Sequence, residues 1–287
     1  MKNKKIKKVF FGTPQISVDF LEKLKNKDFL FDLIVTNPDK PVGRKKVLTP
    51  SPVKKWALEN GIEVLTPERL SDEFLDELVA STTEGGARPK NEKYLFFVLA
   101  YGKILGKNIL DFPELGVWNL HPSLLPKYRG PSPIMSAILD DQKNTGVSLM
   151  LLDEKMDHGP ILAQRKIFVE EWKKNRKMEK WFAEEGADLF LEILGDFVEG
   201  KIIPQKQNHD QATYCEKYHK PDMELKKPLE NRENFLKFLT FPKPFFFDEN
   251  SKRNIVSDGR WNEKEKKFEI LKIIPEGKKE KKWNIIN

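Results

Sequence analysis

Short apolar runs alternate with amphipathic segments over the first 170 residues of the chain. Tyr94–Tyr101 is apolar throughout, which is typical of a strand buried on both faces. Ile16, Phe20 and Leu24 recur at the spacing of a helix face. This alternation predicts an α/β fold, with a Rossmann-like, mostly parallel sheet and flanking helices. The predicted strands cover residues 6–11, 29–36, 62–65, 94–101, 116–120 and 145–152, and the predicted helices begin near 16 and cover 53–60, 67–81 and 133–139.

The pattern changes after residue 170. Glu170–Gly200 has the apolar spacing of one long amphipathic helix, and the stretch after it is polar and rich in loop-forming residues. Ile255–Ile274 has room for two or three short strands. We therefore expect two domains, a larger α/β domain at residues 1–204 and a small β-rich domain at residues 205–287.

The composition is that of a globular protein with a small basic surplus. Of 287 residues, 39% are hydrophobic and 33% are charged, and 51 Lys and Arg against 44 Asp and Glu give a net charge of +7. No apolar run approaches the roughly 18 residues that a membrane helix needs. The apolar stretch behind the basic N-terminus is too short for a signal peptide. We expect a cytoplasmic monomer with no membrane contact.

Two residue counts limit the chemistry. The single cysteine, Cys215, excludes an internal disulfide framework, and four histidines leave little for a metal cluster, so we expect no metal. Residues 205–287 carry 19 basic and 14 acidic side chains, a net charge of +5. This surplus suits a polyanion such as nucleic acid, and it suits a Lys- and Glu-rich surface without such a partner equally well.

Three polar residues suggest acyl transfer to an amine. Asn119 and His121 are two residues apart on a predicted strand, so both side chains leave the same face, at the carboxyl edge where open α/β sheets bind ligands. Asp157 lies in a Met-Asp-His-Gly-Pro turn that could reach this edge. Taken singly, they could be a satisfied polar pair and an ordinary turn aspartate. Together, an amide and an imidazole can donate to an oxyanion, and a carboxylate can orient the imidazole and accept a proton.

The motif Asn-Leu-His-Pro-Ser-Leu-Leu-Pro-Lys-Tyr-Arg-Gly at 119–130, followed by Asp157, resembles the signature of the 10-formyltetrahydrofolate-dependent formyltransferases. The resemblance implies a formyltransferase fold, with Asn119, His121 and Asp157 as the catalytic residues and 10-formyltetrahydrofolate as the co-substrate. It also implies a folate site, which would be formed by Ser123, Leu124, Leu125 and Pro126 with Val98, Ala100, Tyr101 and Gly102 near the pterin.

Further segments of the sequence indicate which molecule would accept the formyl group. The basic loop at 37–54 resembles one that methionyl-tRNA formyltransferases insert after their second strand to hold the acceptor end of the tRNA, and the matching tRNA contacts here are Arg44, Lys45 and Lys46. Phe10–Pro14, Thr213–Lys217 and the motifs near Phe245 and Pro275 also resemble landmarks of this group. The resemblance implies formyl transfer to initiator methionyl-tRNA by a catalytic first domain, with a second domain of the tRNA-binding type.

The chain departs from that pattern in three places. Lys45 stands where the basic loop ordinarily has a glycine, and residues 82–93 form a longer connection than usual. Only about thirty residues separate Phe245 from Pro275, so we expect an abbreviated OB-like module, a three-stranded remnant packed on the long helix. Two other functions remain open, an N-formyltransferase for nucleotide-linked amino sugars and a non-catalytic RNA-binding relative.

Overall fold

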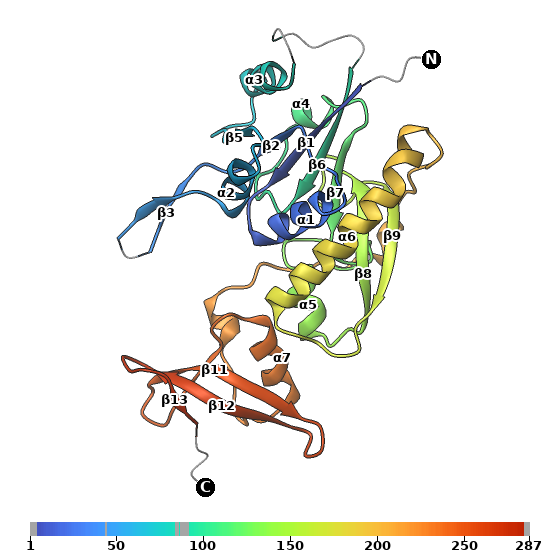
Figure 1. The fold of residues 1–287 in the computed structure, drawn as a ribbon. Coiled ribbons are helices and arrows are strands. Elements are labelled where there is room, and N and C mark those ends of the chain that lie inside the picture. The colour runs from blue at the N-terminus through green and yellow to red at the C-terminus, as the bar shows by residue number, and fades with distance from the viewer. Residues whose placement is uncertain (1–4, 44, 84–85, 87–91, 284–287) are drawn as a thin grey trace. The chain divides into compact units, whose positions relative to one another are not determined.

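A computed structural model describes residues 5–43, 45–83, 86 and 92–283 of the chain. Figure 1 shows the order of its elements. The first part contains β1 (Lys5–Gly12), α1 (Gln15–Lys25), β2 (Leu33–Val35), β3 (Lys40–Val42), β4 (Val47–Thr49), α2 (Pro52–Glu59), β5 (Val64–Leu65), α3 (Asp72–Thr82), β6 (Glu92–Leu99), α4 (Lys107–Leu110) and β7 (Val117–His121). The rest contains α5 (Pro133–Leu139), β8 (Asn144–Leu151), β9 (Ile161–Phe168), α6 (Asn175–Val198), α7 (Arg232–Thr240), β10 (Phe245–Phe247), β11 (Arg253–Asn262), β12 (Lys267–Pro275) and β13 (Lys281–Lys282).

The predicted sheet is confirmed. Seven strands lie in the order β5-β2-β1-β6-β7-β8-β9, of which the first five are parallel and β8 runs antiparallel to β7. The helix predicted at 133–139 has the observed bounds of α5. The strand β9 was not predicted, because its buried and exposed side chains do not form a continuous apolar run.

Aromatic side chains fill one face of the sheet, where α1 and α6 lie. Phe97 of β6 packs on Phe20 of α1, with ring centroids 4.7 Å apart, and on Phe190 of α6 at 5.0 Å. Trp118 of β7 contacts Phe190 as well, at 5.6 Å. Large flat side chains bury much apolar area each, so this layer fixes the strands against both helices.

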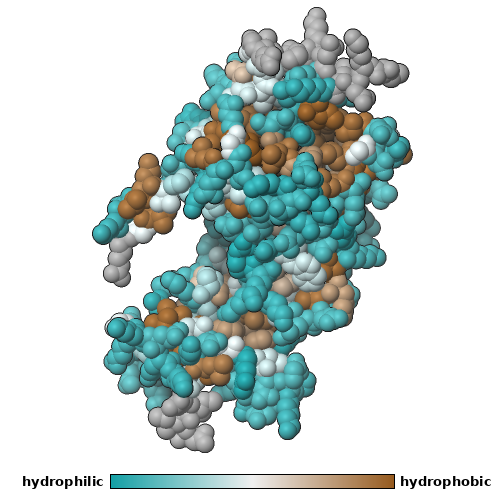
Figure 2. Space-filling model, in the orientation of Figure 1, coloured by the Kyte–Doolittle hydropathy of each residue, from teal (hydrophilic) through white to brown (hydrophobic). Residues whose placement is uncertain are grey.

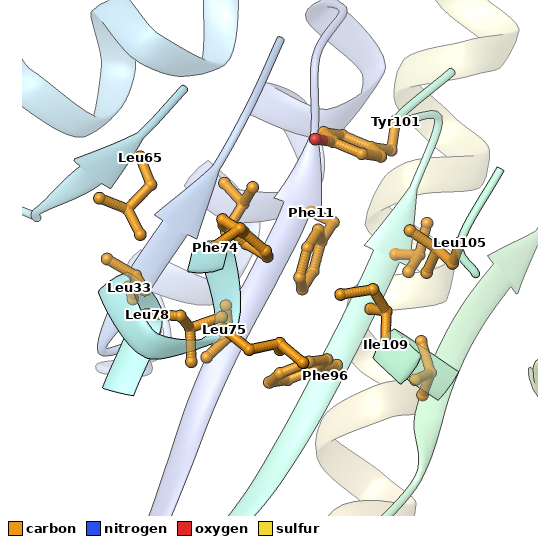
Figure 3. Close-up of a cluster of buried hydrophobic side chains, with 14 of the residues drawn as sticks. Phe11, Leu33, Leu65, Phe74, Leu75, Leu78, Phe96, Tyr101, Leu105 and Ile109 are labelled. Atoms are coloured by element: carbon orange, nitrogen blue, oxygen red, sulfur yellow. The ribbon is translucent and has the colours of Figure 1, made fainter. Parts of the chain in front are cut away.

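The opposite face carries a second apolar cluster, shown in Figure 3. Phe11 and Phe96 project into it from neighbouring strands and contact each other at 5.2 Å, while α3 contributes Phe74 and Leu78. Because successive side chains of a strand point to opposite faces, a strand with a core on both sides must be apolar at every position. This explains the uninterrupted apolar run in β6.

The basic segment after β2, which was expected to be a loop, forms a hairpin. β3 and β4 pair antiparallel, with Val42 opposite Val47. Gly43 (φ 73°) and Lys46 (φ 48°) supply the left-handed backbone of the turn. Pro41 is tolerated because a two-stranded hairpin leaves one side of each strand unpaired.

A second sheet lies in the C-terminal part, where β10, β11, β12 and β13 pair antiparallel in that order. Four strands are present where three were expected, and the helix that packs on them is α7. Phe235 and Phe238 of α7 contact Phe268 of β12, with ring centroids 5.5 and 5.2 Å apart. The antiparallel β-rich C-terminal region is therefore confirmed in a short form.

The chain divides into two compact units, each assembled from separate segments. One unit comprises Met1–Arg129, Gly146–Ile167 and Lys180–Thr213, and the other comprises Gly130–Thr145, Phe168–Glu179 and Tyr214–Asn287. The domain boundary between residues 204 and 205 stays a prediction. Within the described ranges, no helix combines the length and apolarity needed to cross a membrane.

Candidate active site

Asn119 and His121 leave the same face of β7. Trp118 and Leu120 alternate with them and point to the other face, where Trp118 packs on Phe197 of α6 with ring centroids 4.8 Å apart. The sheet order places the carboxyl end of β7 beside that of β6, because the two strands are parallel neighbours. Polar side chains are therefore collected at the edge where α/β sheets bind ligands.

His121 is held between two acceptors. Its side chain is buried, and its Nε2 donates to the backbone carbonyl of Tyr128 at 2.8 Å. Its Nδ1 lies 3.6 Å from Oδ2 of Asp157. A carbonyl can only accept, so Nε2 carries a proton, and a ring protonated on both nitrogens would also suit the carboxylate. The structure thus brings Asp157 from its loop to the imidazole.

A cavity of about 290 Å³ opens beside this pair, and it lies wholly within the first unit. Asn119 and Asp157 line it, together with the four residues at the end of β6 that the formyltransferase resemblance assigned to the pterin. The other lining residues come from the end of β6, from the chain between β6 and the end of α4, and from the segment after β8: Val98, Ala100, Tyr101, Gly102, Lys103, Ile104, Leu105, Leu110, Leu152, Asp153, Glu154, Lys155 and Met156.

The walls combine apolar side chains with backbone polar groups. Ala100 (φ 51°) and Gly102 (φ 82°) have left-handed backbone, which turns the chain sharply at the end of β6. Leu105 and Leu152 supply apolar surface. Burial raises the pKa of Tyr101 to about 12, so its hydroxyl stays protonated at neutral pH. Such a site suits a flat ring with polar edges.

The loop that carries Asp157 is anchored by Gln207, a residue that no sequence pattern singled out. The Nε2 atom of Gln207 donates to the carbonyls of Asp157 and Gly159, at 2.9 and 2.8 Å. Its Oε1 accepts from the guanidinium of Arg129, which is buried. The sequence offered no signal for Gln207, because the burial of Arg129, whose charge needs partners, is seen only in the structure.

The family follows from a comparison with known proteins. The family model described as formyl transferase matches residues 4–194 of the chain. This chain belongs to the formyl transferase family. A methionyl-tRNA formyltransferase of Caldicellulosiruptor saccharolyticus is 41% identical over 210 residues, which are 72% of this chain and 64% of that protein. The chain therefore spans less than two thirds of the length of this relative.

Solved structures of the formyl transferase family share the fold. An N-formyltransferase from Helicobacter canadensis, in complex with folinic acid and dTDP-3-aminofucose, matches with a TM-score of 0.58 at 20% identity over 90% of this chain and 89% of that one. A methionyl-tRNA formyltransferase from Clostridium thermocellum matches with a TM-score of 0.59 at 13% identity over 98% of this chain and 99% of that one. The predicted formyltransferase fold is confirmed.

The other predicted folate contacts lie away from the cavity lining. Ser123 is fully buried and donates to the carbonyl of Lys127 at 2.6 Å, and the N–H of Leu125 donates to Ser148 at 3.0 Å. Neither Leu124 nor Pro126 is among the residues that line the cavity. These contacts fix the loop after β7. A folate contact of Ser123, Leu124, Leu125 or Pro126 stays a prediction.

Two of the predicted tRNA contacts, Lys45 and Lys46, are exposed at the turn of the β3–β4 hairpin, and Arg44 lies outside the described residues. In Figure 2 the hairpin carries hydrophobic surface as well, which belongs to Val42, Val47 and Leu48. Among the described residues, no group of three or more His, Cys, Asp or Glu is arranged to hold a metal ion.

Proposed function

We propose that this chain transfers a formyl group from 10-formyltetrahydrofolate to the free amino group of initiator methionyl-tRNA. One observation carries the proposed chemistry: His121 lies 3.6 Å from Asp157, and Asp157 and Asn119 line the same cavity. An amide and a carboxylate at one cavity, with an imidazole beside the carboxylate, are the groups that direct attack of an amine on a formyl carbon needs.

The cavity fits the ring end of a folate. Its volume of about 290 Å³ is at the lower limit of ligand pockets, so it would enclose part of such a molecule and leave the remainder outside. Peptide groups at Ala100–Gly102 can pair with the polar edge of a pterin, while Leu105 and Leu152 can cover its faces. The folinic acid bound by the Helicobacter canadensis relative supports the same class of co-substrate.

The proposed reaction assigns one role to each polar residue. The amine attacks the formyl carbon, a C–N bond forms, and the oxygen becomes an oxyanion that Asn119 and His121 stabilise by donation. Nε2 of His121 already donates to Tyr128, whereas Nδ1 is 3.6 Å from Asp157, beyond hydrogen-bond distance, so an N–H at Nδ1 can serve the oxyanion. Asp157 orients the ring and takes the proton of the amine, directly or through a water. The bond to N10 of the folate then breaks, and tetrahydrofolate leaves with that proton.

The proposed acceptor rests on the basic hairpin and on the relatives. Lys45 and Lys46 are exposed at its turn, where they can reach phosphates. A methionyl-tRNA formyltransferase is 41% identical over 72% of the chain. We also propose that the enzyme is monomeric and works in the cytoplasm, where charged tRNA is used, and size-exclusion chromatography with light scattering measures its mass.

A formylation assay tests the chemistry. Asp157→Asn retains the shape of the side chain, and asparagine tolerates the left-handed backbone at this position (φ 50°). We expect turnover to fall ~10²–10⁴-fold, because the carboxylate that orients His121 and accepts the proton is lost. Asp196→Asn, an exposed residue of α6, is the matched control and should retain full turnover. Full turnover in Asp157→Asn would overturn the proposal.

A second arm of the assay identifies the acceptor. Label from 10-formyltetrahydrofolate should appear on charged initiator tRNA and not on a dTDP-linked amino sugar. Transfer to the sugar alone would assign the chain to the N-formyltransferases that act on nucleotide-linked amino sugars. Protein that binds tRNA but transfers no label to either acceptor would favour a non-catalytic RNA-binding role.

A further inference from the structure

Every hydrogen-bonding position of the Gln207 amide is in use. The two N–H bonds of Nε2 go to the carbonyls of Asp157 and Gly159, at 2.9 and 2.8 Å. The two lone pairs of Oε1 face Nε and an Nη atom of Arg129, at 3.2 and 2.6 Å. The residue is 6% exposed, and it does not line the cavity. It therefore contacts the backbone of the Asp157 loop and not the space where a substrate would lie.

The Asp157 loop needs such an anchor. Asp157 has left-handed backbone (φ 50°), a conformation that is unfavourable for most residues. Two residues later the chain passes close to β8, since a Cβ atom on Gly159 would lie 2.0 Å from the carbonyl oxygen of Leu151. The two carbonyls that Gln207 binds lie on either side of His158. One amide thus fixes the part of the loop that sets the direction of the Asp157 side chain.

Arg129 makes this anchor rigid. It is 1% exposed, and besides Gln207 it contacts Nδ1 of His209 at 2.9 Å. A guanidinium that donates to an amide oxygen polarises the amide, so the N–H groups on its other side become better donors. The charge of Arg129 is in this way transmitted to the backbone of the Asp157 loop.

We propose that Gln207 is a positioning residue, which holds the backbone at Asp157 so that the carboxylate stays within reach of Nδ1 of His121. The proposal rests on the proposed formyl transfer, and it adds a residue that acts through Asp157 without touching substrate. Loss of the anchor should lower kcat and leave substrate affinity nearly unchanged, because Gln207 itself does not line the cavity and Asp157 is one of many residues that do.

The decisive variant is Gln207→Glu. Glutamate has the same shape and can still accept from Arg129, so the fold should be retained, but a carboxylate cannot donate to the carbonyls of Asp157 and Gly159. We expect kcat to fall ~10–100-fold, as for small misplacements of a catalytic group, and KM for the folate and for tRNA to change less than about 3-fold. The matched control is Gln205→Glu, an exposed residue two positions earlier with the same change of charge.

A double variant separates positioning from a merely structural role. If Gln207 acts through Asp157, then Gln207→Glu combined with Asp157→Asn should be no slower than Asp157→Asn alone, because residues that act as a unit are not additive. Unchanged kcat in Gln207→Glu, or losses that multiply in the double variant, would overturn the inference. Full turnover in Asp157→Asn alone would instead refute the proposed formyl transfer. If circular dichroism shows that Gln207→Glu does not fold, kcat and KM are measured for Gln207→Met instead, and the same outcomes support or overturn the inference.

Discussion

His209 is a residue whose surroundings oppose its protonation. Its ring stacks on that of His158, with centroids 4.0 Å apart and 4° between the planes. Arg129 can only donate, so Nδ1 of His209 accepts from it and carries no proton there. Partial desolvation of this exposed ring, followed by the charges of His158, Arg129 and Lys155, lowers the pKa of His209 below 6.5. Asp153, which contacts His158 at 2.6 Å, acts in the opposite direction.

This pKa predicts a pH dependence of stability. In the folded protein the pKa of His209 lies below 6.5, its ordinary value in an unfolded chain. The stabilisation of the folded state by the neutral ring is therefore fully present above pH 6.5 and is lost as pH falls through the folded pKa. His209→Gln retains an acceptor for Arg129 and cannot be protonated. Urea unfolding should therefore show that lowering the pH from about 7.5 to 5.5 destabilises the wild type more than His209→Gln. Parallel losses in both proteins would contradict this origin.

The candidate site could be predicted from sequence only where a motif carried it. Asn119 and His121 belong to one strand, and the rule that loops gather at the carboxyl edge of a parallel sheet brought Asp157 toward them. Their catalytic roles stay predictions. Gln207 could not be found in this way, because in sequence it resembles the exposed Gln205 beside it. Only the fold shows that one amide is buried and the other faces solvent.

At the scale of elements, the β3–β4 hairpin predicts how the proposed use of tRNA depends on salt concentration. Lys45→Ala with Lys46→Ala should raise KM for tRNA and reduce the slope of log KM against log salt by about 1–2, because fewer phosphate contacts release fewer counterions. The same change at the exposed Lys25 and Lys27 is the control. Equal slopes for the wild type and the hairpin variant would exclude these lysines from tRNA binding.

Helices and strands were predictable where their buried apolar residues follow a regular pattern along the sequence. The helix at 133–139 and the strand near 94–101 carry regular patterns because they face the protein interior. The hairpin gave no such signal, since its six strand residues are all exposed. The helix α7 was missed for the opposite reason. Its Phe and Leu residues are buried on most of its surface, so neither a helical nor a strand period stands out.

At the scale of the whole molecule, residues 205–213 are bound to the unit that contains the site. Gln205 pairs with Ile161 through two backbone hydrogen bonds of 2.8 Å. The carbonyl of Thr213 accepts from the N–H of Arg129, also at 2.8 Å. This segment also carries Gln207. A cut at 204 would therefore remove contacts that a cut at 213 retains.

Two truncated chains test where the first domain ends. A chain that ends at Thr213 should melt cooperatively and at a higher temperature than one that ends at Pro204, because only the longer chain retains Gln207 and the bridge from Gln205 to β9. Thermal denaturation followed by circular dichroism measures the difference. Equal melting temperatures would support the boundary predicted between residues 204 and 205.

The exposed apolar residues of the hairpin bear on how concentrated solutions of the protein behave. Val42, Val47 and Leu48 are 56, 59 and 65% exposed, on short strands whose outer edges can pair with another chain. Like charges beside such strands act as gatekeepers, because two hairpins that approach each other bring their lysines together. Lys45 and Lys46 would then also keep the free protein dispersed, and their loss should promote aggregation at low salt.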